Sequence, residues 1–132
     1  MTQTSFSPYQ RILAFDYGLK HIGVAFSDSP IPQPLKTIHR FDQISPLIHQ
    51  FRPQLLVVGL PQGPLVDSVK LFTRRLRQEF KLPVVLHPEI LSTQEAVQRL
   101  RQLKASRRKL NQNHMYAAAI ILEDYLESLE RL

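Results

Sequence analysis

With 132 residues, 43% of them hydrophobic, the chain is long enough for one globular domain and too short for two, so we expect a single domain over residues 1–132. Its 17 basic and 11 acidic side chains give a net charge of +6, which suits a polyanionic partner such as nucleic acid. The lack of cysteine excludes disulfides and thiolate zinc sites, and the lack of a long apolar run or a signal-peptide pattern predicts a cytoplasmic protein that does not enter a membrane.

The first part of the chain predicts a tail followed by antiparallel strands. We expect residues 1–10 to form a flexible N-terminal tail. Residues 11–16 predict a short buried strand, with an apolar run between Arg11 and a final aspartate. Residues 21–27 alternate large and small side chains, as a strand with one close-packed face does. Because only residues 17–20 separate them, the two strands are expected to form an antiparallel hairpin. After three prolines, residues 35–39 predict an edge strand.

The rest of the chain predicts helices alternating with strands. The helices share apolar residues three or four apart, and we expect them over residues 42–52, 65–81, 92–103 and 112–131. Continuous apolar runs predict strands buried on both faces at residues 54–61 and 82–90. The pattern as a whole predicts a three-layer α/β domain. Its mixed five-stranded sheet would contain the antiparallel hairpin and parallel strands, with helices on both faces.

Asp16 stands at the tip of the first strand, and Gly18 follows closely. Ligands bind beyond the carboxyl ends of parallel strands, so Asp16, Gly59–Pro61 and His87–Glu89 are candidates for one site. A carboxylate there is costly to desolvate unless a positive group meets it, and a divalent cation is one solution. Alternatively, Asp16 caps its own turn through the backbone N–H of Gly18. Gly18, Gly59 and Pro61 are expected to shape the turns at this edge.

Four motifs occur in order along the chain: FDYGLKHIGVAFSD, LLVVGLP, EILSTQEA and AAAIILEDYL. Together they resemble the YqgF (RuvX-like) family of Holliday-junction-resolvase-like or precursor ribosomal RNA nucleases. The resemblance implies a ribonuclease H-like fold and hydrolysis of phosphodiester bonds in structured RNA or Holliday junction DNA. It also implies Mg²⁺ or Mn²⁺ as the cofactor if the protein is active. Of the family's acids, it assigns two to Asp16 and Glu89, as catalytic residues and metal ligands.

The chain departs from the family at the other two expected acids. Pro88 replaces the aspartate before Glu89, and His114 replaces the aspartate at the start of the last helix. The loop after VVGLP is also shorter, and its one acid is Asp67. Whether His87, His114 or Asp67 takes the place of the missing acids is open, and so is whether the histidines merely fill vacated space. The loss of two negative charges predicts that an active site would bind metal weakly or with an altered metal preference.

Basic residues near the expected site predict contacts with phosphate groups. They are Lys20, Arg74, Arg75, Arg99, Arg101, Lys104, Arg107, Arg108 and Lys109. A solvated helix surface is the alternative, and it is what we expect for the acidic residues 123–130. No base-reading motif is present, so recognition of shape or backbone is favoured.

The sequence therefore leaves three hypotheses. The first is a metal-dependent nuclease that acts on structured nucleic acid with an incomplete acidic site. The second is a catalytically degenerate member of the family that binds nucleic acid or a protein partner. The third is an interaction module whose basic patch binds an acidic protein.

Overall fold

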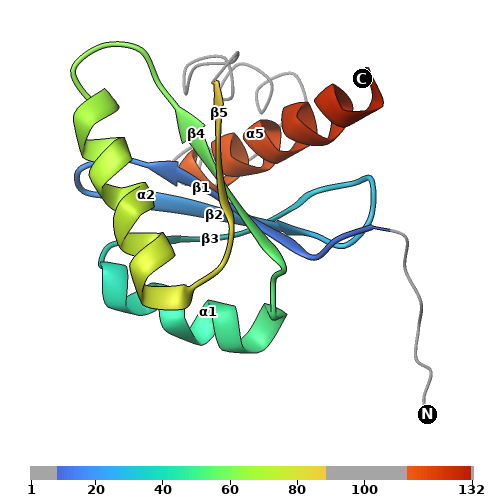
Figure 1. The fold of residues 1–132 in the computed structure, drawn as a ribbon, viewed down its shortest axis with the longest axis horizontal. Helices are drawn as coiled ribbons and strands as arrows, with labels where there is room; N and C mark the ends of the chain where they lie inside the picture. Colours follow the sequence, from blue (N-terminus) through green and yellow to red (C-terminus); the bar gives the residue numbers. More distant parts are fainter. Residues whose placement is uncertain (1–8, 89–112, 132) are drawn as a thin grey trace.

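The computed structural model describes residues 9–88 and 113–131, which form a five-stranded sheet between two layers of helices (Figure 1). The strands are β1 (Ile12–Tyr17), β2 (Ile22–Ser27), β3 (Gln33–Ile38), β4 (Leu55–Leu60) and β5 (Val84–Pro88). The helices are the short 3₁₀ helix η1 (Phe41–Gln43), α1 (Ile44–Phe51), α2 (Val66–Phe80) and α5 (Asn113–Glu130). The strand order is β3-β2-β1-β4-β5. Because β1 pairs antiparallel with β2 and parallel with β4, the predicted mixed sheet is confirmed.

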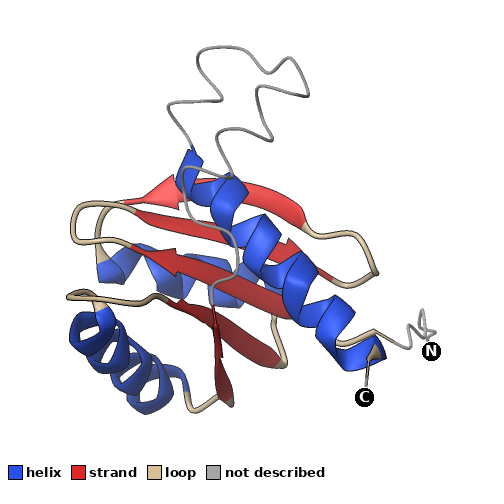
Figure 2. Cartoon of the chain, turned by 90° about the horizontal axis from the view of Figure 1, so that it is seen from above, coloured by secondary structure: helices blue, strands red, loops and turns tan. Residues whose placement is uncertain are grey.

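Alternation along β1 sends successive side chains to opposite faces of the sheet. Leu13 and Phe15 join a core cluster under α1 and α2, whereas Ile12 and Ala14 join a second cluster under α5. Figure 2 shows α5 crossing one face of the sheet, with α1 and α2 on the other. Asp16 continues the second set, so its side chain lies on the face that α5 covers.

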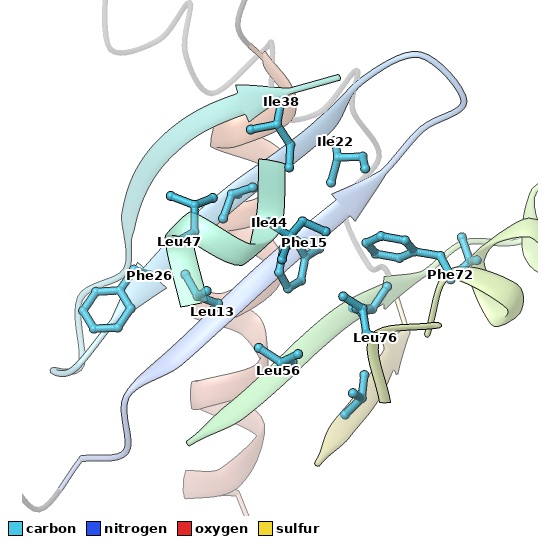
Figure 3. Packing of buried hydrophobic residues seen from close by; sticks show 14 residues of the cluster. Leu13, Phe15, Ile22, Phe26, Ile38, Ile44, Leu47, Leu56, Phe72 and Leu76 are labelled. Atoms are coloured by element: carbon cyan, nitrogen blue, oxygen red, sulfur yellow. The ribbon is translucent and has the colours of Figure 1, made fainter. Parts of the chain in front are cut away.

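The face under α1 and α2 carries the larger core side chains (Figure 3). Ile44 of α1 and Phe72 and Leu76 of α2 lie over the sheet, where all three are buried. Burying a side chain of this size stabilises the fold by roughly 1.5–3 kcal/mol. The apolar spacing that predicted the two helices therefore identified the faces that pack on the sheet.

The face under α5 is lined by small residues of β2. Gly23, Ala25 and Ser27 lie on this face, and each is part of a strand in which every residue is buried. A Cβ at Gly23 would overlap the backbone carbonyl of His114 in α5. The predicted close-packed face of this strand is confirmed, and α5 is what packs against it.

Two sequence expectations about the strands are wrong. The strand after α2 was expected to be buried on both faces, but β5 is half-buried at the edge of the described sheet, because its one described neighbour is β4. Gly59 was expected in a turn, but it lies inside β4 and pairs with His87, so it belongs to the ladder. Pro61 follows directly after the strand, where its missing N–H costs the ladder nothing.

Several expectations lie outside the described residues. They concern the N-terminal tail at residues 1–8, the helix that was predicted from Ser92, and Glu89. Among the helices of residues 9–88 and 113–131, none has both the length and the apolar character needed to cross a bilayer.

Candidate active site

Asp16 is the only charged side chain among the buried residues that the structure describes, and the residue is 6% exposed. It lies next to the end of β1 and is opposite Gly23 in the hairpin register. Burying a carboxylate without a partner costs several kcal/mol or more. Its position therefore requires a positive group or a strong donor nearby.

His114, in the first turn of α5, is this partner. Its Nδ1 lies 3.1 Å from Oδ2 of Asp16, and the two side chains are 27% and 9% exposed. The hydrogen bond to Asp16 raises the pKa of His114; partial burial opposes this rise, and the charge of the carboxylate adds to it. When the imidazole is protonated, its charge offsets that of the buried carboxylate. His114, which the resemblance aligned with a family acid, thus contacts the carboxylate of Asp16.

The backbone of the hairpin turn shows that Asp16 does not cap its own turn through Gly18. The N–H of Gly18 donates to the carbonyl oxygen of His21 at 2.8 Å, which closes the hairpin. A Cβ at Gly18 would lie 2.9 Å from the same oxygen and 3.6 Å from Cε1 of His114. Glycine therefore allows the turn to fold tightly beside the imidazole.

Two further histidines extend the site toward β3. Antiparallel pairing of β2 and β3 places His21, just before β2, beside His39, just after β3. Their Nδ1 atoms are 3.1 Å apart, so one ring donates to the other, and the ring centre of His21 lies 5.4 Å from that of His114. Partial desolvation lowers the pKa of His21, and the charges of His114, His39 and Lys20 lower it further. Sequence reasoning missed both residues, because their meeting depends on the register in which the two strands pair.

The described side chains do not by themselves fit the divalent ion that the resemblance implies. Mg²⁺ takes about six oxygen ligands in a nearly octahedral arrangement. Here Asp16 contacts an imidazole, and no group of three His, Cys, Asp or Glu side chains within the described ranges is arranged to hold a metal. Glu89, the second predicted ligand, lies outside those ranges. Asp67, considered as a substitute, is exposed in the first turn of α2.

His87, also considered as a substitute ligand, contacts a different acid. Its Nε2 lies 2.6 Å from Oδ2 of Asp124 in α5, and its ring packs edge-on against Tyr125, whose pKa is raised by burial. The expectation of a solvated surface over residues 123–130 is therefore wrong at Asp124, because α5 faces β5 at this point. The His87–Asp124 pair joins the two elements that flank residues 89–112.

Three of the predicted nucleic-acid-binding residues are described. Lys20 is exposed in the hairpin turn, and Arg74 and Arg75 are exposed on α2. The guanidinium carbon of Arg75 lies 3.8 Å from the ring centre of Phe41. Arg77, by contrast, donates to a carbonyl oxygen at the start of β5 at 3.0 Å, so it connects α2 to the sheet. The residues outside the described ranges are Arg99, Arg101, Lys104, Arg107, Arg108 and Lys109.

Comparison with known proteins gives consistent matches. A family model described as "RuvX: Holliday junction resolvase" matches residues 10–128. The chain is 40% identical over 133 aligned positions to a Methylobacillus flagellatus protein named "Putative pre-16S rRNA nuclease", with 89% of this chain and 91% of the relative covered.

Solved structures show the same fold at low sequence identity. RuvC of T. thermophilus, in complex with a Holliday junction substrate, matches with a TM-score of 0.63 at 14% identity and covers 92% of this chain and 96% of that one. The fowlpox virus Holliday junction resolvase matches with a TM-score of 0.55 at 14% identity, over 90% and 99% of the two chains. The predicted ribonuclease H-like fold is confirmed.

Proposed function

The chain belongs to the RuvX family, and we propose that it is a nuclease that hydrolyses phosphodiester bonds in structured nucleic acid, with precursor 16S rRNA as the substrate. One observation carries the proposal: the carboxylate of Asp16 is buried near the carboxyl end of a central strand and is held by His114. Charged groups that are costly to bury cluster at functional sites. This edge of an α/β sheet is also where ligands bind.

The Asp16–His114 pair suits the proton transfers of hydrolysis. Water adds to phosphorus, one P–O bond breaks, and a proton must pass from the attacking water toward the leaving oxygen. Because Asp16 holds the imidazole of His114 at Nδ1, the other ring nitrogen, Nε2, is the one that can exchange a proton with the substrate. Family membership supports dependence on Mg²⁺ or Mn²⁺. We assign no step to the ion, because the described residues do not complete a site for it.

The relatives support RNA as the substrate. The protein that shares 40% identity with this chain is named for precursor 16S rRNA. The structures named for Holliday junctions share 14% identity, a level at which likeness supports the fold alone. Exposed Lys20 and Arg74 and the net charge of +6 suit either polyanion.

A second function is favoured by His114 itself. An imidazole in place of the expected acid removes a negative charge, and its protonated form opposes the binding of a cation beside Asp16. In this alternative the chain binds the same RNA without cleaving it.

The two functions differ in cleavage. A labelled RNA that spans one end of mature 16S rRNA would be incubated with the protein and Mg²⁺, Mn²⁺ or EDTA, beside a four-way DNA junction. We expect the RNA to be cut faster than the junction. Asp16→Asn should lower the rate about 100-fold or more without weakening binding. Glu79→Gln neutralises an exposed acid on α2 and should keep the wild-type rate. Binding without cleavage under all three conditions would overturn the nuclease in favour of the alternative.

A further inference from the structure

A cavity of about 310 Å³ lies beside the turn that follows Asp16. Tyr17 and Gly18 line one side of it, and residues of η1 and α2 line another. Tyr17 packs against the core under α1 and α2, so the cavity opens on the face opposite the Asp16 carboxylate. Its volume is at the small end of the roughly 300–1,000 Å³ range of ligand pockets. A single nucleotide suits this volume, whereas a duplex does not.

Aromatic rings form the walls of the cavity. The ring centre of Phe72 lies 4.7 Å from that of Tyr17 and 6.0 Å from that of Phe41. The guanidinium of Arg75 lies over the ring of Phe41, and all four residues line the cavity. Aromatic rings and guanidinium planes are the surfaces on which proteins stack unpaired bases.

The rim of the cavity combines apolar and polar groups. Leu19 and Leu71 line it while remaining 74% and 61% exposed. Ser68 and His39 contribute hydrogen-bonding groups beside the charge of Arg75. A pocket with apolar walls, a few polar groups and one exposed cation is complementary to a ligand that is flat and apolar at one end and anionic at the other. A nucleotide has this chemistry.

We propose that this cavity receives one unpaired nucleotide of the nucleic-acid substrate, with its base stacked on the pair formed by Phe41 and Arg75. The proposal rests on the proposed function and narrows its substrate to nucleic acid with a bulged or single-stranded nucleotide next to the phosphate that is cut. Because Tyr17 and Gly18 directly follow Asp16, a nucleotide in the cavity brings the adjoining backbone to the edge of the sheet where Asp16 lies.

The test measures the affinity of the full chain for two RNA duplexes that differ at one bulged position. One carries adenosine there and the other an abasic residue. The wild type should bind the RNA with the adenosine bulge about tenfold more tightly than the RNA with the abasic bulge, which is the effect of stacking one base. Arg75→Gln should bring this ratio of the two affinities most of the way to one. Arg74→Gln changes the same charge at the neighbouring position, which does not line the cavity. It should weaken binding of both RNAs equally and keep the ratio.

Ser68→Met provides a second variant that fills the cavity without changing a charge, and it should bring the ratio close to one. A wild-type ratio near one would overturn the proposal, as would a ratio that survives both Arg75→Gln and Ser68→Met. Failure of the proposed function is separate, because it appears as the absence of cleavage. A protein that cuts RNA with a ratio of one is a nuclease without this nucleotide site.

Discussion

The backbone carbonyl of His114 occupies the space in which any residue other than glycine at position 23 would place its Cβ. Gly23 is also the register partner of Asp16 across the hairpin. One glycine therefore sets how closely the helix that carries His114 approaches the strand that carries Asp16. The pairing of the two side chains depends on this backbone contact.

Gly23→Ala is expected to push the first turn of α5 away from the sheet and to separate His114 from Asp16. Because the overlapping atoms belong to the backbone, the helix must move, and the free energy of unfolding should fall by about 1–3 kcal/mol. Ser27→Ala is a control on the same strand and face. The Ser27 hydroxyl is buried without a hydrogen-bond partner in the described structure, so its removal should be neutral or slightly stabilising. Urea unfolding measures the free energy of unfolding of both variants. A Gly23→Ala variant that is as stable as the wild type would contradict this placement of α5.

The contribution of the Asp16–His114 pair to stability should depend on pH. The folded-state pKa of His114 is raised above 6.5, mainly by its hydrogen bond to Asp16. The stabilisation is therefore complete below that value and is lost as the pH rises through the folded-state pKa. The wild type should have a higher free energy of unfolding than His114→Gln, and this difference should be about 1 kcal/mol larger at about pH 5.5 than at about pH 9. His49→Gln removes an exposed histidine of α1 and is the control for the loss of an imidazole elsewhere in the fold. A difference between wild type and His114→Gln that is constant with pH would contradict the pairing.

The His87–Asp124 contact should connect β5 to α5. His87→Gln and Asp124→Asn should each destabilise the fold, and the double variant should lose less than the sum of the two single losses. We expect a coupling free energy of about 1 kcal/mol, because both side chains are largely buried at 13% and 22% exposure. A double-mutant cycle in urea unfolding gives this value directly, and additive effects would show that the contact contributes nothing.

Local pattern was enough to place Asp16 and the main elements. The apolar run up to Asp16 predicted a strand that delivers a carboxylate to its tip, and the helical spacing of Phe72 and Leu76 predicted the face that packs on the sheet. Both signals arise from the period of one element, so they do not depend on the tertiary structure. The resemblance also drew attention to His114, because it aligned that position with a family acid, and the structure brings His114 into contact with Asp16.

Long-range relationships could not be obtained in the same way. The apolar residues of β5 predicted a strand, but how many neighbours that strand has depends on the whole sheet. The meeting of His21 and His39 depends on the pairing of β2 with β3, which contains a register shift between Val24 and Ala25. The link between His87 and Asp124 depends on the direction in which α5 crosses the sheet. Each is a contact between elements, which a single element's pattern does not contain.

We propose that phosphodiester cleavage depends on Asp16. The measurement to make first is the single-turnover rate of cleavage of a precursor 16S rRNA fragment, with protein in saturating excess so that differences in affinity do not enter. With Mg²⁺ or Mn²⁺ supplied, we predict that the wild type cleaves the fragment and that Asp16→Asn is slower by about 100-fold or more. Equal rates for the two proteins, or a wild type that is saturated with RNA and does not cut it, would contradict the claim.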